Sequence, residues 1–376
     1  QNKYGKTALM RATIKSQENV ALEILRNKDV DVNLQDKDGI TALMWAIHEG
    51  QEDIALEIFQ RNDVNVNLQG GNDSHTALMW AIMKGHKDIA LEILKHKEID
   101  VVHIIDHSNA PYLKTVSENS SVKKLITCHD LIAVRTALGE FHNAPKTSQT
   151  GVIFQKWIQD SLSFADFYAC DSLQTKDDLN RISPYTKPIS KVIHLGTEWD
   201  ASSRSKLSKK EYEIPFDPSQ EPFFLHVGSA AWYKNREGVF RSFINAKKQT
   251  KLDNLKLLLV GPKIQDFEID EEIGAWLQAH QEDIVSVPHV SDPLLQDLYL
   301  RAKALIFPSH VEGFGWPPLE AASVGCPVIT TKTGAIFDLL GNYATYTDSN
   351  DQSKIDREVI NCLKYPNKRI EKVKLP

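Results

Sequence analysis

The chain has 376 residues, a formal net charge of −6, 41% hydrophobic residues and 25% charged residues. This length suits two or three domains with cores of their own, and the mild acidity argues against nucleic acid as the main partner, which needs a concentrated basic face. No apolar run approaches the roughly 18 residues that span a bilayer. No signal peptide follows Gln1, and we expect a cytoplasmic location, with peripheral attachment to a membrane left open, and a missing or processed N-terminus.

Three copies of one unit open the chain. They are GKTALMRATIKSQENVALEIL (5–25), GITALMWAIHEGQEDIALEIF (39–59) and SHTALMWAIMKGHKDIALEIL (74–94). Thr7, Thr41 and Thr76 mark the same position, with steps of 34 and 35 residues. Each copy predicts two short helices joined by a turn, and extended segments such as DVNVNLQGGND follow. Residues 1–100 therefore resemble ankyrin repeats, which implies an all-α array that presents a surface to a protein partner.

Trp45 and Trp80 occupy equivalent positions in two of the copies. Either they pack within the repeat stack or they form an exposed pair that binds a partner. The array also shows no polar N-terminal cap of the kind that stacked repeats need for solubility, which favours a fragment.

Alternating strand-like and helix-like segments replace the repeats at Val101, and such alternation predicts a parallel sheet covered by helices. We expect a first α/β domain over 101–200, with a strand-like run at the start of 101–113, strands at 124–131, 166–172 and 191–196, and helices at 153–165 and 175–182. A polar stretch over 197–222 predicts an interdomain linker, and we assign the linker itself to residues 201–222.

A second, doubly wound α/β domain is expected over 223–376. Its predicted strands are 223–228, 255–261, 284–290, 304–309 and 327–331, and its predicted helices are 238–249, 270–281, 293–302 and 317–324. Ligands in such domains bind at the carboxyl ends of the strands. We therefore expect the site in the loops that follow these strands.

The loop after strand 304–309 carries Glu312-Gly-Phe-Gly and leads into a helix that holds Glu320. Gly313 and Gly315 let the backbone approach a ligand closely, and the helix N-terminus offers N–H groups to an anion. A carboxylate suits the hydroxyls of a ribose or a sugar better than a phosphate. The alternative is a capped surface helix whose acidic residues are simply solvated.

Lys234 and Arg236 follow the strand end at Gly228 and precede a helix, where cations oppose the dipole unless an anion lies between them. A diphosphate would satisfy this arrangement, and the alternative is two solvated loop cations. At the third strand end, VPHVSD with Val290, backbone groups could meet a base. We expect His226, His289 and His310 to be structural.

Residues 101–365 resemble the retaining glycosyltransferases of the family 4 type (glycosyl transferases group 1). The resemblance rests on the Glu-x7-Glu around Gly-x-Gly, the Lys-Asn of YKNR, and the segments HIIDHSNAPYL, TCHDL and KVIHLG. It implies a GT-B fold, two Rossmann-like domains around a cleft, and transfer from a nucleotide sugar without a metal or another cofactor. The sequence does not tell whether the donor is UDP- or GDP-linked, and the acceptor is an unknown glycan or lipid-linked sugar.

The resemblance also assigns roles. Glu320 binds the ribose; Glu312 contacts the transferred sugar, with help from the backbone of Gly313, Phe314, Gly315 and Trp316. Lys234, with Arg236 nearby, holds the diphosphate and stabilises the leaving nucleotide. His129 matches the active-site histidine of that family, or else caps the following turn.

The first half of the family's acceptor domain is absent, and ankyrin repeats run directly into Val101. The acceptor-side domain is therefore expected to be truncated. An alternative function is a binding protein whose ankyrin array does the work beside an inactive transferase-like domain.

Overall fold

A computed structural model describes residues 1–94, 99–116, 122–183, 189–196, 214–262 and 270–364 of the chain. The chain divides into two compact units. One unit consists of Gln1–Thr127, Trp157–Tyr168 and Ser183–Ile189, and the other consists of Cys128–Lys156, Ala169–Ile182 and Ser190–Pro376. The sequence-based division into four segments remains a prediction, and most of its linker lies outside the described residues.

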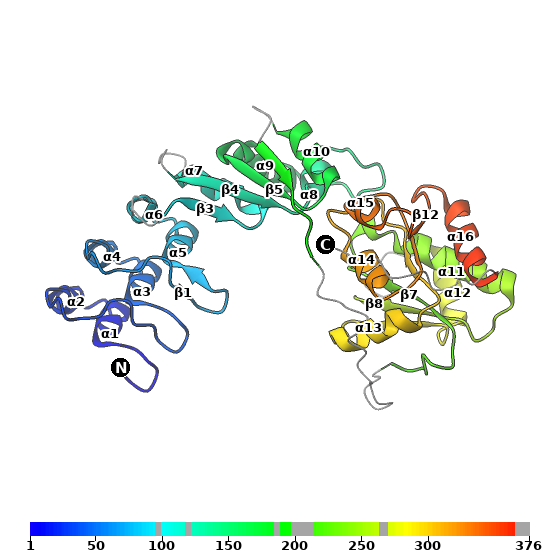
Figure 1. Cartoon of the computed structure of the whole chain (residues 1–376), viewed down its shortest axis with the longest axis horizontal. Helices are drawn as coiled ribbons and strands as arrows, with labels where there is room; N and C mark the ends of the chain where they lie inside the picture. The colour runs from blue at the N-terminus through cyan, green and yellow to red at the C-terminus, as the bar shows by residue number, and fades with distance from the viewer. Residues whose placement is uncertain (95–98, 117–121, 184–188, 197–213, 263–269, 365–376) are drawn as a thin grey trace. The chain divides into compact units, whose positions relative to one another are not determined.

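Three helix pairs form the repeat array, and they follow one another along the blue part of the chain (Figure 1). The pairs are α1 (Ala8–Ile14) with α2 (Glu18–Leu25), α3 (Ala42–His48) with α4 (Glu52–Phe59), and α5 (Ala77–Lys84) with α6 (Lys87–Leu94). The equivalent threonines Thr7, Thr41 and Thr76 are the N-caps of α1, α3 and α5, and each side chain accepts a hydrogen bond from the amide three residues on. The predicted repeat unit is confirmed. The threonine recurs in each copy because its side chain caps the first helix of the pair.

Trp45 and Trp80 are both half-buried, and the ring of His48 lies edge-on to each, at centroid distances of 5.8 and 5.2 Å. The indole N–H of Trp45 donates to Asp36 at 3.1 Å. Lys6 lies 3.9 Å from the centre of the Trp45 ring. These contacts favour packing of the two tryptophans within the repeat stack over an open pair.

The first α/β segment contains a parallel pair, β3 (Val101–Ile104) with β4 (Lys123–Cys128), in a sheet of strand order β3-β4-β5-β6. The remaining strands and the main helices of this segment are β5 (Phe167–Cys170), β6 (Ile189–Val192), α8 (Ile132–Ala137), α9 (Gln149–Ser161) and α10 (Leu173–Ile182). The predicted strands and both predicted helices are present, whereas α8 was not predicted because its run of six residues is too short to show a period.

The second α/β segment has a six-stranded parallel sheet of order β12-β11-β10-β7-β8-β9. Its strands are β7 (Phe223–Val227), β8 (Lys256–Val260), β9 (Ile284–Val287), β10 (Leu305–Phe307), β11 (Val328–Thr330) and β12 (Thr345–Tyr346). The chain proceeds from β7 outward to β9 and then returns to β10 on the other side of β7. The strand order therefore reverses between β7 and β10, which is where ligands bind in open α/β sheets.

Helices cover both faces of this sheet (Figure 1). One core cluster, around Phe307 and Leu319, lies beneath α13 (Asp292–Arg301), α14 (Trp316–Ser323) and α15 (Ile336–Leu340). The other, around Phe240 and Leu257, lies beneath α11 (Arg236–Thr250), α12 (Glu271–Ala279) and α16 (Gln352–Lys364). The predicted doubly wound domain is confirmed, and β12, α15 and α16 extend it beyond the predicted elements.

None of the four cysteines is in a disulfide: Cys128, Cys170 and Cys326 are buried, and Cys362 is half-buried. Across the ranges described above, no helix is both long and apolar enough to cross a bilayer.

Candidate functional site

Lys234 and Glu312 meet at the point where the strand order reverses. Lys234 ends a short 3₁₀ turn after β7, and Glu312 lies on the loop after β10. The Lys234 Nζ donates to both carboxylate oxygens of Glu312, at 2.8 and 2.9 Å. The sequence predicted both residues for one site, but it did not predict that they form an ion pair with each other.

This ion pair is nearly withdrawn from solvent. The side chains of Lys234 and Glu312 are 12% and 7% exposed. Burial raises the pKa of the Glu312 carboxyl, and the charge of Lys234 opposes that rise. The rings of Phe307 and Tyr233 lie 4.9 and 5.3 Å from the ammonium, which adds cation–π attraction. A buried pair of this kind is poised to exchange partners, because a ligand that brings phosphate oxygens and hydroxyls can satisfy both groups.

Arg236 is placed differently from Lys234. It is the first residue of α11 and is buried, and its guanidinium donates to the carbonyl oxygens of Pro262 at 2.8 Å and Gly228 at 2.6 Å. These bonds tie the ends of β7 and β8 together. The stem of Lys234 packs beside Gly228, where an added Cβ would lie 3.5 Å from it. Arg236 therefore holds the loop that presents Lys234.

Asn235 fixes the same loop from the other side. It adopts a left-handed conformation with φ of 50°, and its side-chain oxygen accepts from the amide of Gly238 to cap α11. Its amide nitrogen donates to the carbonyl oxygens of Pro308 and Ser349, at 3.2 and 3.3 Å. The loops after β7, β10 and β12 are thereby held by one residue.

The two glycines of Glu-Gly-Phe-Gly are required by packing. A Cβ on Gly313 would lie 2.4 Å from the carbonyl oxygen of His129. Gly315 has φ of 93°, and a Cβ there would lie 2.5 Å from the side chain of Ile336. The sequence analysis explained these glycines by the close approach of a ligand. The structure adds a second reason, which is that neighbouring protein atoms leave no room for a side chain.

Gly315 is also the N-cap of α14, and the next residues limit what this helix end can bind. Pro317 and Pro318 occupy its first turn and carry no N–H. The helix N-terminus therefore offers fewer amide donors than the usual four. Phe314 is buried and packs edge-on to Trp316, whose side chain is 39% exposed.

Glu320 lies one turn into α14 and contacts Tyr299. The hydroxyl of Tyr299 donates to its carboxylate at 3.1 Å. Burial raises the pKa of Glu320 to about 7, and the Tyr299 hydrogen bond opposes part of that rise. Val290, the residue expected near a base, is buried in the core on the same face of the sheet. Tyr299 was missed by sequence reasoning, since nothing near it in the chain marks it as a partner of Glu320.

His129 follows β4 directly, as predicted, and its ring is held by a carboxylate. Its Nδ1 lies 2.6 Å from the Oδ2 of Asp171, which is itself buried, whereas the His129 side chain is 42% exposed. Burial raises the pKa of Asp171, and the neighbouring His129 opposes that rise. Asp171 follows β5 directly, so the strand-end rule that selected His129 would also have selected it.

A second link joins this histidine's surroundings to the Glu312 loop. The Gln174 side-chain oxygen accepts from the amide of Gly334 at 2.7 Å and from the hydroxyl of Thr333 at 3.2 Å. Thr333 in turn accepts from the amide of Glu312 at 3.0 Å. The backbone position of Glu312 is thus fixed by residues far away in the sequence.

Of the histidines expected to be structural, His226 has contacts that fit this role. His226 is fully buried, its Nδ1 lies 2.9 Å from the Ile306 carbonyl oxygen, and burial lowers its pKa to about 3. His289 is exposed. Within the described ranges, no group of three or more histidine, cysteine, aspartate or glutamate residues is arranged to hold a metal ion.

Family models match both parts of the chain. Residues 9–104 match the model for ankyrin repeats in three copies, and residues 208–373 match the model for glycosyl transferases group 1. By these matches, residues 208–373 are similar to a group 1 glycosyl transferase domain, and residues 9–104 are similar to an ankyrin array. The helix pairs of the array and the parallel sheet of this transferase domain agree with the two assignments.

Several curated relatives align with part of the chain. The O-antigen chain mannosyltransferase RfbU of Salmonella typhimurium is 30% identical over 154 residues, which is 39% of this chain and 40% of that protein. The serotype-specific mannosyltransferase WbdA of Escherichia coli is 26% identical over 61% of this chain and 28% of its own length. The chain therefore spans less than half the length of these relatives.

Solved structures show the same fold at low identity. Sucrose-phosphate synthase from Thermosynechococcus elongatus aligns with a TM-score of 0.55 and 18% identity, over 76% of this chain and 70% of that one. Anabaena HepE, solved with UDP and glucose, aligns with a TM-score of 0.55 and 15% identity, over 78% and 73%. These similarities establish a GT-B-like fold.

Proposed function

We propose that the chain is a retaining glycosyltransferase that moves a sugar from a nucleotide-sugar donor to an acceptor hydroxyl in the synthesis of a glycan. The observation that carries the proposal is the buried Lys234–Glu312 pair at the reversal of the strand order. Such a pair offers one cation for a diphosphate and one carboxylate for sugar hydroxyls at adjacent positions.

The donor would bind across the loops that the structure fixes most tightly. Lys234 would exchange Glu312 for the diphosphate, and Glu312 would then accept hydrogen bonds from the transferred sugar. Glu320 would accept from the ribose hydroxyls. The backbone from Gly313 to Trp316 would border the phosphates, and Arg236 would act by holding the ends of β7 and β8.

The reaction itself needs charge stabilisation more than proton transfer. As the bond between the sugar and the phosphate breaks, negative charge grows on the departing diphosphate, and Lys234 would stabilise it without a metal or another cofactor. The acceptor hydroxyl would attack from the same face of the sugar and lose its proton to the leaving phosphate. His129, oriented by Asp171, would contact the sugar or its acceptor.

The activities named for the relatives suggest which donor to test first. RfbU is an O-antigen chain mannosyltransferase, WbdA is a serotype-specific mannosyltransferase, and a third relative is the capsular polysaccharide biosynthesis glycosyltransferase CapM of Staphylococcus aureus, 40% identical over 92 residues. That match covers 24% of this chain and 23% of CapM. GDP-mannose is the first donor to test, with UDP-glucose as the second.

Calorimetric titration with GDP and with UDP tests the donor site. We expect one of them to bind, and Glu320→Ala to weaken that binding by at least about tenfold because the ribose hydroxyls lose a buried acceptor. Glu271→Ala, which removes an exposed carboxylate from α12 of the same domain, is the control and should leave the affinity unchanged. Absence of binding heat with both nucleotides would refute the proposed function.

The ankyrin array supports a second role, because such repeats present a surface to protein partners. The alternative function, a binding protein with an inactive transferase domain, shares the nucleotide site with the first proposal. It differs in predicting no consumption of any sugar nucleotide.

A further inference from the structure

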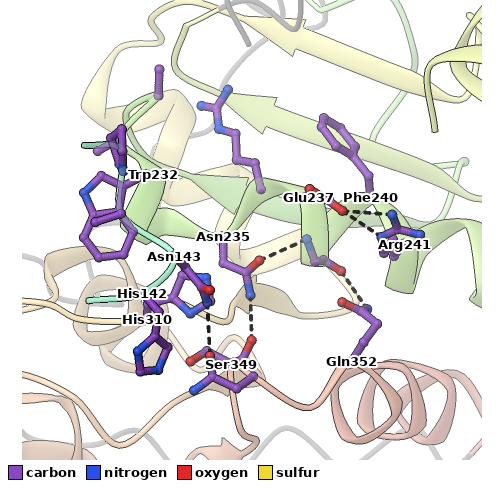
Figure 2. Close-up of a pocket in the computed structure, with 17 residues that line it drawn as sticks. His142, Asn143, Trp232, Asn235, Glu237, Phe240, Arg241, His310, Ser349 and Gln352 are labelled. Carbon is purple, nitrogen blue, oxygen red and sulfur yellow. Dashed lines mark hydrogen bonds and ion pairs between the residues drawn. The ribbon is translucent and has the colours of Figure 1, made fainter. Parts of the chain in front are cut away.

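A cavity of about 1080 Å³ lies beside the N-terminal end of α11 (Figure 2), and neither Glu320 nor Val290 lines it. Its walls come from the loop at 142–145, the loop at 230–235, His310, and residues 349–352 at the start of α16. All of these segments belong to one compact unit of the chain. The roles proposed for the donor site use neither this volume nor most of the residues around it.

One wall of the cavity is flat and aromatic. The rings of Trp232 and His310 lie stacked, with centroids 6.1 Å apart and planes at 22°. The ring of Phe141 supports Trp232 at 5.2 Å. The amide of His310 donates to the carbonyl oxygen of Tyr233 at 2.8 Å, which joins the two loops behind this wall. Burial lowers the pKa of His310, so its ring is uncharged at neutral pH.

The charged groups that line the cavity are engaged with protein atoms. Arg241 pairs with Glu237 at 2.9 Å and with Asp270 at 3.4 Å. The guanidinium of Arg236 is bound to two backbone carbonyl oxygens. An anion would therefore meet an Arg241 charge that two carboxylates already balance and an Arg236 side chain that is buried. The charges therefore argue against an anionic ligand.

Neutral amide and imidazole groups remain to meet a ligand. Asn143 donates to Asn350 over a long 3.3 Å, and both residues are exposed, as is His142. Opposite them, Gln352 is held rigidly by hydrogen bonds to Gly238, Ser242 and Asp356. Figure 2 shows these side chains from α11, α16 and the two loops around a common space. Such a surface offers neutral hydrogen-bond donors and acceptors beside the charged groups that are already engaged.

We propose that this cavity binds a neutral oligosaccharide, separate from the nucleotide sugar. A pyranose ring presents C–H groups on its faces and hydroxyls around its edge. The faces suit the Trp232 wall, and the hydroxyls suit the Asn and His side chains. The volume is at the upper end of ordinary ligand sites, which suits more than one sugar unit.

The position of the cavity links this glycan to the reaction. Trp232 and His310 each stand two residues before a member of the Lys234–Glu312 pair. A glycan on the Trp232 wall would therefore lie against the same two loops as the sugar donor. The assignment of this glycan as the acceptor or the product rests on the proposed function. The binding of the glycan to the cavity does not.

Binding of α-mannotriose and of maltotriose to the full chain tests the proposal, by saturation-transfer NMR and by calorimetry. We expect saturable binding of at least one of them at about millimolar concentration, and a loss of about tenfold or more in Trp232→Ala. Trp157→Ala is the matched control, because Trp157 is exposed on α9, does not line the cavity and belongs to the other compact unit. Asn143→Ala, an exposed substitution, should weaken binding several-fold while leaving the wall intact.

The same samples are titrated with GDP and UDP. Nucleotide affinity in Trp232→Ala that stays within about twofold of wild type shows that the loop around Lys234 is preserved, and the loss of saccharide binding then belongs to the cavity. Failure of both saccharides to bind at concentrations up to about 10 mM would overturn the proposal, as would equal binding by the wild type and Trp232→Ala. Absence of nucleotide binding alone would contradict the proposed function. The saccharide titrations would then still decide whether the cavity binds an oligosaccharide.

Discussion

Glu320 lies inside the transferase domain with its carboxylate against the hydroxyl of Tyr299, and burial raises its pKa from 4.5 to about 7. The folded chain therefore holds a proton on Glu320 over a range in which the unfolded chain has released it. Stability is accordingly lost as the pH rises from about 4.5 to about 7, and the full destabilisation persists at higher pH. A ribose that brings hydroxyl donors to this carboxylate would relieve that destabilisation.

Glu320→Gln should raise the unfolding temperature of the domain at about pH 8 and leave it nearly unchanged at about pH 4.5. A shift from 4.5 to about 7 corresponds to at most about 3 kcal/mol, or about 5–10 °C for a domain of this size. Differential scanning calorimetry measures both temperatures, with Glu271→Gln on the exposed side of α12 as the control. An equal effect of Glu320→Gln at the two pH values would contradict the assigned pKa.

The ion pairs and hydrogen bonds at single residues were the least predictable features from sequence. Lys234 and Glu312 are 78 residues apart, and Tyr299 and Glu320 are 21 apart, so no local pattern links either pair. The residues themselves could be selected, because each predicted one follows a strand or opens a helix at the edge where ligands bind. Their partners depend on how the strands are ordered, which the sequence pattern does not specify.

The loop after β10 is the element on which the candidate site depends. Its residue Gly313 packs against the backbone of His129, and an added Cβ would lie 2.4 Å from that carbonyl oxygen. Backbone atoms cannot rotate out of the way as a flexible side chain can. The loop and the end of β4 must therefore separate if any side chain is placed at Gly313.

Gly313→Ala should destabilise the domain by about 1–3 kcal/mol and weaken nucleotide binding, because the displaced loop carries Glu312. Gly274→Ala is the matched control: it lies inside α12, and an added Cβ there meets nothing within 4 Å. That control should stabilise the helix by up to about 1 kcal/mol. Thermal unfolding and nucleotide titration check both variants, and a Gly313→Ala protein as stable as Gly274→Ala would refute the packing argument.

Helices and strands with a clear period were predicted well. The threonines that begin the repeats became helix caps, and the apolar runs of the second α/β segment became β7 to β11. The boundaries were less accurate: α11 begins at Arg236, two residues before the predicted start, which turns Arg236 from a loop cation into a buried residue of the helix. Short elements such as β12, with two residues, give no periodic signal.

At the scale of the whole molecule, two architectures with different physical demands share one chain. The repeat array buries its core between neighbouring helix pairs and needs no site of its own. The transferase domain builds a core on both faces of one sheet and leaves its strand ends for a ligand. The resemblance in sequence and the geometry at the strand ends both support the proposed donor site and, with it, the proposed sugar transfer.

Release of nucleoside diphosphate from GDP-mannose, UDP-glucose and related sugar nucleotides by the full chain, with and without oligosaccharide acceptors, tests that claim most directly. We predict release from at least one donor, reduced by about 100-fold in Lys234→Ala because the departing diphosphate loses its cation. The Glu271→Ala control should release nucleotide at the wild-type rate. A chain that binds GDP or UDP and yet releases no nucleoside diphosphate from any donor would contradict sugar transfer and favour the ankyrin-based binding protein.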